Sequence, residues 1–266
     1  MSAGPLQFEW AAHTDRGLRR PGNEDAWSAT ALGAVPTPLT PAQPAAPGDG
    51  LLFTVSDGIG GSRAGEVASA FCVSQLAVEL AARRTEPDAA AALHAAFLAT
   101  HAELARRAAS RPDWHGMGAT LTALWLTADG AAWFGHVGDS RLYARTGEGW
   151  LPCTLDHSVG AGLVRRGEMT AEAVQRMRLR SLLEQAMGGD GAPIEPQVGE
   201  LALGPDAEFM LCSDGLHGPL GDALEDHLAA THGADLARRG DRLLAAALAA
   251  GGPDNITVLS VRARRG

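Results

Sequence analysis

The stretch Val55-Ser56-Asp57-Gly58-Ile59-Gly60-Gly61 indicates how the rest of the chain is organised. It begins at the end of a short apolar run, 51–55, which has the length and composition of a β-strand. Asp57 is therefore predicted to lie where a strand ends and a loop begins, with its carboxylate facing a site. The glycines that follow let the backbone approach closely whatever Asp57 binds. A carboxylate beside an accessible carbonyl favours a hard divalent cation, although an Asp-Gly pair alone more often marks a tight turn.

Acidic residues recur beside three further apolar runs. This recurrence favours a binding site at Asp57 over a simple tight turn. The acidic residues lie in the segments Asn23-Glu24-Asp25, Ser213-Asp214-Gly215 and Pro253-Asp254-Asn255. Each segment stands at one end of a predicted strand. A fold that gathers these strand ends would build a carboxylate-rich metal site whose ligands are all oxygen atoms.

Length and composition favour a soluble globular protein. The 266 residues are 45% hydrophobic, which is enough to bury a substantial core, and we expect a single domain over 1–266. The formal net charge of −9 argues against nucleic-acid or anionic-membrane partners. We see no run of about 18 apolar residues that could span a bilayer and no signal peptide. Three widely spaced cysteines indicate a reducing compartment, so we expect a cytoplasmic location.

The order of the predicted elements favours two mostly antiparallel sheets with helix pairs outside them. Strands are predicted at 6–13, 26–32, 51–55, 119–126, 131–137, 141–145, 207–212 and 256–263, and helices at 62–84, 88–110 and 234–250. The proline-rich stretch 36–50 is predicted to be a surface loop that cannot join a strand ladder. The polar, arginine-rich stretch 156–187 is predicted to be a surface flap.

Convergence of the carboxylates Asp25, Asp57, Asp214 and Asp254 would create strong repulsion unless cations neutralised it. Two ions that share one carboxylate form a general hydrolytic site, which activates a water for attack on phosphorus or on a carbonyl. The absence of a Cys or His ligand set favours Mg²⁺ or Mn²⁺ over Zn²⁺. Arg20 is the nearest cation in the sequence, and its guanidinium can hold a phosphate.

At this point the sequence resembles a known family over residues 8–263. The motifs that carry the resemblance are Arg20-Pro21-Gly22-Asn23-Glu24-Asp25, Ser56-Asp57-Gly58-Ile59-Gly60-Gly61, Gly116-Met117-Gly118-Ala119-Thr120, His136-Val137-Gly138-Asp139-Ser140-Arg141, Leu155-Asp156-His157-Ser158, Ser213-Asp214-Gly215 and Asp254-Asn255. Their order is similar to that in the metal-dependent type 2C serine/threonine protein phosphatases, and the compact bacterial branch is the best match. The resemblance implies an α+β fold, a four-layer αββα sandwich with a flap beside the metal site.

The resemblance also implies a role for each matching residue. Asp57 would bridge two Mn²⁺ or Mg²⁺ ions, and the Gly58 carbonyl would bind one of them. The remaining metal positions are Asp214 and Asp254 on the other ion, Glu24 and Asp25 largely through bound waters, and Asp139 on a third, weaker ion. Arg20 would hold the substrate phosphate, and Thr120 and Asn255 would support the ligands from behind.

The general acid is less well defined by the resemblance. Some family members carry a histidine just after the Asp-Gly pair, where this chain has Ile59. A metal-bound water or His157 is the remaining candidate to protonate the leaving oxygen.

The function implied is hydrolysis of phosphoserine and phosphothreonine in proteins by direct attack of a metal-bridging water. Phosphorylated proteins, made by a serine/threonine kinase, would be the partners, and we expect a monomer. Two alternatives stay open: a catalytically weak signalling module that binds phosphoproteins, and a hydrolase of small phosphoesters.

Overall fold

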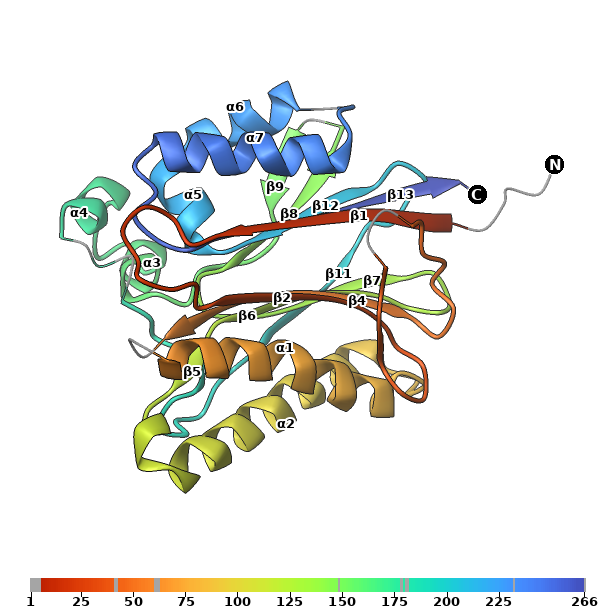
Figure 1. Ribbon diagram of the computed structural model, residues 1–266, viewed down its shortest axis with the longest axis horizontal. Helices are drawn as coiled ribbons and strands as arrows, with labels where there is room; N and C mark the ends of the chain where they lie inside the picture. Colours follow the sequence, from red (N-terminus) through yellow and green to blue (C-terminus); the bar gives the residue numbers. More distant parts are fainter. Residues whose placement is uncertain are drawn as a thin grey trace.

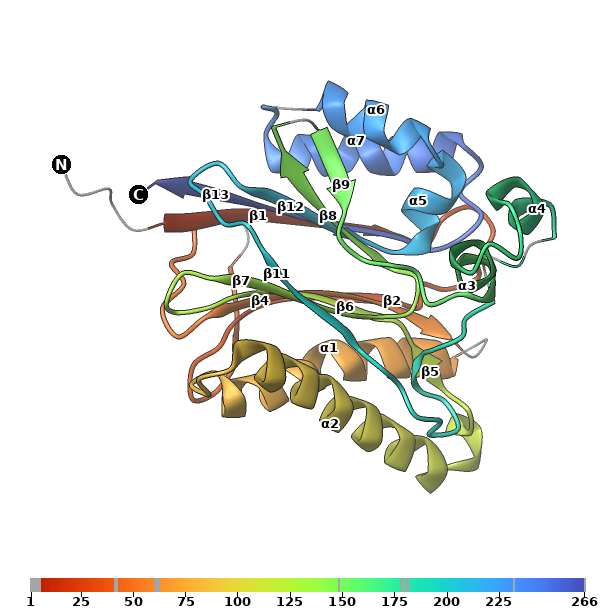
Figure 2. The same ribbon diagram turned by 180° about the vertical axis from the view of Figure 1, so that it is seen from behind.

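The computed structural model describes residues 6–40, 43–59, 63–147, 149–177, 179, 182–231 and 233–265. Two β-sheets lie face to face in the middle of the molecule, and helices cover the outer face of each sheet (Figures 1 and 2). Every strand pairing in these ranges is antiparallel. The predicted αββα sandwich is therefore confirmed.

The first sheet has the order β1-β13-β12-β8-β9. Its strands are β1 (Leu6–Asp15), β13 (Ile256–Arg265), β12 (Glu208–Cys212), β8 (Arg141–Thr146) and β9 (Gly149–Pro152). The first and last long strands of the chain pair along their whole length, from Leu6 opposite Arg265 to Asp15 opposite Ile256. This pairing brings the Arg20 segment, which follows β1, next to the Asp254 segment, which precedes β13.

The second sheet has the order β10-β5-β4-β6-β7-β11, with β2 paired to β4 and β3 to β2. Its strands are β2 (Asp25–Ala31), β3 (Thr37–Pro38), β4 (Leu51–Ile59), β5 (Gly118–Ala119), β6 (Leu121–Leu126), β7 (Ala132–Val137), β10 (Met187–Gly188) and β11 (Gln197–Leu201). The strand β4 lies at the centre of this sheet, so the segment around Asp57 is held from both sides.

Long helices cover the second sheet and shorter ones the first (Figure 1). Beneath the second sheet lie α1 (Arg63–Arg83) and α2 (Ala89–Ser110), the latter capped by the Asp88 side chain, and a 3-10 turn, Pro112–Trp114, follows. On the first sheet lie α5 (Asp214–Leu220), α6 (Ala223–Ala230) and α7 (Leu236–Ala249). The flap contains α3 (Val159–Arg165) and α4 (Ala171–Arg176), which project at one end of the sandwich.

Strand periodicity explains why the acidic segments meet. The core between the sheets takes every second residue of β4, namely Leu51, Phe53 and Val55, and the corresponding Phe209 and Leu211 of β12. Because side chains alternate along a strand, the next residues on the same face are Asp57 and Ser213. The polar site is thus the continuation of the apolar core at one end of the sandwich.

Several elements differ from the sequence-based predictions. β4 continues through Asp57 and Gly58 to Ile59, so the prediction that the strand ends before Asp57 is wrong; β5 supplies the extra partner strand for Gly58 and Ile59. The stretch 36–50 does join a ladder, because Thr37–Pro38 pairs with β2 at an edge where proline is tolerated. Ser62, the predicted N-cap of the first helix, lies outside the described residues.

Helix α1 meets the length and composition test for a membrane span, which we did not expect. Its segment Ala64–Arg83 has 20 residues and a mean hydropathy of 1.2, and 56% of the most apolar window is buried inside the protein. The helix packs against the second sheet and, along its side, against α2 (Figure 2). Burial in the core accounts for its apolar composition.

Candidate metal centre

Two carboxylates face each other across neighbouring strands at the end of the second sheet. Asp25 on β2 stands directly opposite Asp57 on β4. One oxygen of Asp25, Oδ2, accepts a hydrogen bond of 2.7 Å from the Ser213 hydroxyl, which comes from the other sheet. The other oxygen, Oδ1, is buried without a hydrogen-bond partner. A buried carboxylate oxygen without a donor is costly unless a cation binds it.

The carboxylates of this site raise one another's pKa values. Burial raises the pKa of Asp25 to about 7, and the negative charges of Asp214 and Asp254 add to the effect. Burial and the charge of Asp214 likewise raise the pKa of Asp139 to about 8. The pKa of Asp57 lies well above its usual range because of burial and the charges of Asp25 and Asp214. Such mutual repulsion is what a bound divalent cation relieves.

Arg20 brings a positive charge to the rim of this site. Its Nη2 atom donates to Oδ2 of Asp254 at 2.6 Å, with half of the arginine side chain exposed. That hydrogen bond raises the pKa of Arg20, and the negative charges of Asp254, Asp57 and Asp214 raise it further. The guanidinium thus lies within electrostatic reach of the carboxylates while solvent can still reach it.

Asn255 fastens the loop that carries Arg20 and Glu24. Its Oδ1 accepts a hydrogen bond of 2.8 Å from the Glu24 backbone N–H. Its Nδ2 donates to the backbone carbonyls of Arg16 and Gly22, both at 2.8 Å. One buried side chain therefore fixes both ends of the loop relative to β13.

Close backbone packing explains the glycine that follows Asp57. The Gly58 N–H donates to the Glu24 carbonyl at 3.2 Å, and a Cβ atom on Gly58 would overlap the carbonyl of Gly65 in α1. The Glu24 carboxylate lies against Gly65, because a Cβ atom there would approach its Oε2 to 2.7 Å. Burial raises the pKa of Glu24. Glu24 thus flanks Asp25 on the side of α1.

Thr120 links Asp57 to the turn that carries Asp139. Its hydroxyl accepts a hydrogen bond of 2.9 Å from the Asp57 N–H and lies 2.7 Å from the Ser140 hydroxyl. Its backbone N–H donates to the Asp57 carbonyl at 2.9 Å. The two ligand-bearing segments are therefore held in register through one threonine.

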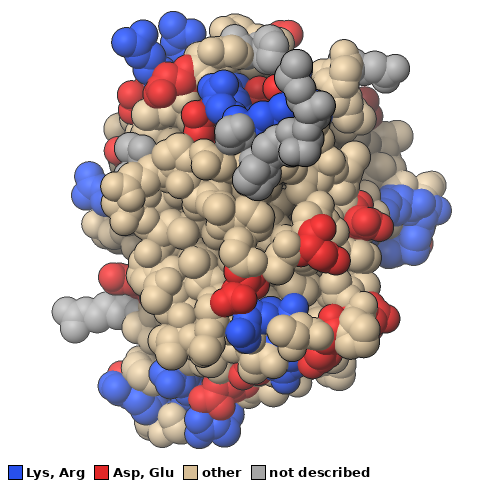
Figure 3. All heavy atoms as spheres, turned by 90° about the vertical axis from the view of Figure 1, so that its right-hand side faces the viewer, with Lys and Arg blue, Asp and Glu red and all other residues tan. Residues whose placement is uncertain are grey.

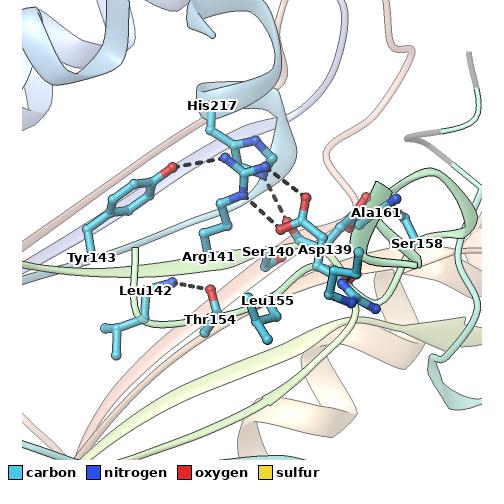
Figure 4. Close-up of polar contacts among 12 residues, drawn as sticks. Asp139, Ser140, Arg141, Leu142, Tyr143, Thr154, Leu155, Ser158, Ala161 and His217 are labelled. Carbon is cyan, nitrogen blue, oxygen red and sulfur yellow. Dashed lines mark hydrogen bonds and ion pairs between the residues drawn. The ribbon is translucent and has the colours of Figure 1, made fainter. Parts of the chain in front are cut away.

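A cavity of about 990 Å³ opens beside the carboxylates, between the flap and α5–α6. Asp139 and Asp214 line the end that touches the metal centre. His217 of α5 reaches across the cavity to Asp139, with Nε2 2.9 Å from its backbone carbonyl oxygen (Figure 4). Arg141, labelled in the same view, forms two contacts of 2.8 Å with the carboxylate of Asp156.

His157 lies behind the site rather than at its open end. Its Nδ1 is 3.3 Å from the Gly138 N–H, which donates to it, and its own N–H donates to the Gly138 carbonyl at 2.7 Å. Burial and the charge of Arg165 lower its pKa, so it is neutral at pH 7. A neutral, largely buried imidazole is a poor acid, and a general-acid role for His157 stays a prediction that this geometry does not favour.

The donor chemistry of the site fits hard divalent cations. The side chains at the end of the sandwich are carboxylates, and one of their oxygens, Asp25 Oδ1, is buried without a donor. In the part of the chain that the structure describes, no three His, Cys, Asp or Glu side chains form a ready-made ligand set. An ion would therefore be held by carboxylates together with backbone carbonyls and water, as Mg²⁺ and Mn²⁺ commonly are.

Sequence reasoning missed two residues of the site, Ser140 and Ser213. Ser213 donates to Asp25 and accepts a hydrogen bond of 2.9 Å from the Thr257 N–H, so it joins the two sheets at the site. Its signal in the sequence was its place two residues after Leu211, on the strand face that leads into the core. Ser140 carried no such signal, because its contact with Thr120 depends on how two turns meet.

Known proteins resemble this chain over most of its length. The family described as Protein phosphatase 2C matches residues 44–250. The serine/threonine protein phosphatase PstP of Mycobacterium tuberculosis is 35% identical over 260 residues, which is 97% of this chain and 46% of that protein. This chain thus spans about half the length of that relative. The serine/threonine phosphatase stp of Listeria innocua is 32% identical over 214 residues, covering 79% of this chain and 83% of that protein.

Among solved structures, the fold is similar to the catalytic domain of PstP in complex with two manganese ions. The TM-score is 0.78 at 33% sequence identity, and the match covers 97% of this chain and 99% of that one.

Proposed function

This chain belongs to the protein phosphatase 2C family, and from that premise we propose that it is a metal-dependent serine/threonine protein phosphatase. The observation that carries the proposal is the pair Asp25 and Asp57, which face each other at the end of the sandwich with a buried oxygen that lacks a donor. Asp214 and Asp254 raise the pKa values of this pair by their charge. Carboxylates that repel one another in this way favour bound cations, which would also make the site receptive to an anionic phosphate.

We assign the metal-binding positions as the sequence predicts them. Asp57 and the Gly58 carbonyl would hold the first ion, and Asp57, Asp214 and Asp254 the second. Glu24 and Asp25 would act largely through water, and Asp139, beside Asp214, would serve a third ion. When bound, two Mn²⁺ or Mg²⁺ ions supply positive charge at the phosphate and a water made nucleophilic near neutral pH.

Arg20 is proposed to bind and orient the substrate phosphate. Its half-exposed guanidinium already bonds to one acidic group at 2.6 Å, and the fork geometry of arginine suits phosphate oxygens as well as carboxylate oxygens. The three hydrogen bonds of Asn255 keep the Arg20 loop at a fixed distance from β13. The Thr120 hydroxyl, which accepts a hydrogen bond from the Asp57 N–H, likewise holds Asp57 in place.

The substrates we propose are proteins phosphorylated on serine or threonine by a protein kinase. The open cavity beside Asp139 and Asp214 supports a macromolecular substrate, because it leaves room for chain on one side of the phosphorylated residue. A monomeric state and a cytoplasmic location stay predictions from the sequence.

The test is hydrolysis of a phosphothreonine peptide and of p-nitrophenyl phosphate, each with millimolar Mn²⁺ and with EDTA. We expect Mn²⁺-dependent release of phosphate from both, with kcat/KM at least tenfold higher for the peptide. Turnover of the ester alone would point to a small-phosphoester hydrolase. Binding of the phosphopeptide without turnover in any metal would point to a signalling module.

A further inference from the structure

The cavity beside the metal centre has two walls of different chemistry, and what they select deepens the proposed function, on which this inference rests. From Asp139 and Asp214 the cavity extends between the flap on one side and the α5–α6 segment on the other. The cavity volume of about 990 Å³ is large enough for several side chains. A substrate phosphate at the metal centre would place the neighbouring residues of its chain in this space.

The α5–α6 wall ends in two acidic side chains, Asp222 and Glu225. Both line the cavity and both are exposed. Asp222 stands at the N-cap of α6, but its side chain makes no capping hydrogen bond. Within the described ranges, neither side chain has an ion-pair partner. Their charge is therefore available to a ligand in the cavity.

Of the two arginines that line the cavity, Arg141 is paired with a carboxylate, whereas Arg165 keeps its positive charge on the opposite, flap wall. Arg141 is neutralised by its two contacts with the Asp156 carboxylate. Arg165, on the flap wall, donates to the backbone carbonyl of Asp156 at 2.9 Å. The far end of the α5–α6 wall thus presents a net negative surface.

Apolar side chains from both walls also line the cavity. Val174 and Leu224 are buried in the cavity walls, whereas Leu155 and Val164 are 55% and 38% exposed. A lysine or arginine side chain pairs an apolar stem with a charged head. That combination matches a cavity lined by both apolar side chains and acidic groups.

The length of α5 sets the spacing. The helix covers Asp214–Leu220, which is about 10 Å at about 1.5 Å per residue. An extended peptide advances about 3.3 Å per residue. Asp222 follows the end of α5 by two residues, so the acidic pair begins about three to four residues from the phosphorylated one along an extended substrate.

We propose that Asp222 and Glu225 form a subsite that selects phosphoproteins with a lysine or arginine about three residues from the phosphorylated serine or threonine. The subsite adds to substrate binding and takes no part in the chemistry. Its effect falls on KM rather than on kcat, because the contact is equally strong in the bound substrate and in the transition state.

The test uses the full chain with Mn²⁺ and a set of otherwise neutral phosphothreonine peptides, with one arginine moved through four positions on each side. We expect kcat/KM to peak about three residues away on one side, about threefold to tenfold above the same peptide without arginine, since each exposed charge pair contributes about twofold to fivefold. The double variant Asp222→Asn with Glu225→Gln should remove this preference, and about 0.5 M NaCl should weaken it.

Two controls separate the possible failures. Asp226→Asn changes an exposed acidic residue in the same first turn of α6, outside the cavity lining, and should keep the preference. Hydrolysis of p-nitrophenyl phosphate should be unchanged in all variants. A preference that survives the double variant, or equal kcat/KM for all peptides, overturns the subsite. Loss of turnover on the ester and on every peptide in the wild type overturns the phosphatase proposal, and the subsite with it.

Discussion

The carboxylate of Asp25 combines structure and function in one side chain. One oxygen is held by Ser213 from the opposite sheet, and the other is buried without a donor. Burial and neighbouring charges raise its pKa to about 7. The residue that ties the sheets together is thus also one that gains most from a bound cation.

Arg20 gives a direct prediction about phosphate binding. Arg20→Ala should lower kcat/KM about tenfold to a hundredfold, because a charge-assisted bond to phosphate contributes about 1.5–3 kcal/mol. The loss should be similar for a phosphopeptide and for p-nitrophenyl phosphate, since both carry the phosphate. Steady-state kinetics with Mn²⁺ measures this, with Arg19→Ala, at an exposed neighbouring position, as the control. An unchanged kcat/KM together with a lower Tm would reduce Arg20 to a structural partner of Asp254.

His136 gives a prediction about pH and stability. Burial and the nearby His157 lower the pKa of His136 to about 3, whereas an unfolded histidine titrates near 6.5. Between pH 6.5 and 3 the His136 imidazole is therefore protonated in the unfolded chain but neutral in the folded protein. Its stabilising contribution is present above pH 6.5, and the free energy of unfolding should fall by about 1.4 kcal/mol per pH unit below about pH 6.

Urea unfolding at pH 7, 6 and 5 in EDTA measures that slope. His136→Gln keeps a partner for the Thr122 hydroxyl, which lies 2.9 Å from Nδ1, and should make the decline shallower. His94→Gln, at a half-exposed position on α2, should leave it as in the wild type. The same slope for His136→Gln and for the wild type would contradict the assignment.

At the scale of elements, the short helix α5 depends on one close contact. It begins at Asp214, and a Cβ atom on Gly215 would overlap the carbonyl oxygen of Asn255. Gly215→Ala should therefore push α5 away from β13 and lower the free energy of unfolding by about 1–3 kcal/mol. Because Asp214 moves with α5, affinity for Mn²⁺ should fall as well.

Thermal unfolding and Mn²⁺ titration calorimetry test this pair of effects. Gly204→Ala serves as the control, since a Cβ atom there meets nothing within 4 Å. If Gly215→Ala matched the control in both Tm and Mn²⁺ affinity, the contact between α5 and Asn255 would not position Asp214.

Most long elements were predictable from the sequence, and short ones were not. The long strands have clear apolar runs, α2 is capped at Asp88 and α7 has a clear apolar face, whereas α1 was predictable from its length and apolar composition. Helix α5 escaped prediction because Asp214–Leu220 contains glycine and proline, and it is held by its packing against α7 and β13. The edge strand β11 has only intermediate or exposed residues and β9 has a single buried one, Trp150, so their pairing partners define them.

At the site, the positions of the acidic residues were predictable from the sequence, but the contacts that hold them were not. Acidic residues at strand ends gave the positions Asp25, Asp57, Asp214 and Asp254. The contacts that hold them, such as Ser213 with Asp25 and Asn255 with Glu24, join residues 188 and 231 positions apart in sequence. The pairing of β13 with β1 and with β12, together with the packing of the two sheets, brings those segments together.

At the scale of the whole molecule, the chain's chemistry is concentrated at one end of the sandwich. The opposite end, with the chain termini, carries acidic and basic side chains scattered among neutral ones on the face that Figure 3 shows. The flap and α5 lie at the other end, with the loop that follows β1 (Figure 1). The sandwich acts as a rigid frame that brings four chain segments distant in sequence to one place.

The most direct test of this account is Mn²⁺ binding and phosphothreonine-peptide hydrolysis by Asp57→Asn, with the exposed Asp190→Asn as control. Removing a shared metal ligand should weaken Mn²⁺ binding by at least tenfold in calorimetry and lower kcat by orders of magnitude, because several kcal/mol of transition-state stabilisation are lost. Asp190→Asn should match the wild type. Wild-type Mn²⁺ affinity and turnover in Asp57→Asn would contradict the central claim that the Asp25–Asp57 pair builds the metal centre of a phosphatase.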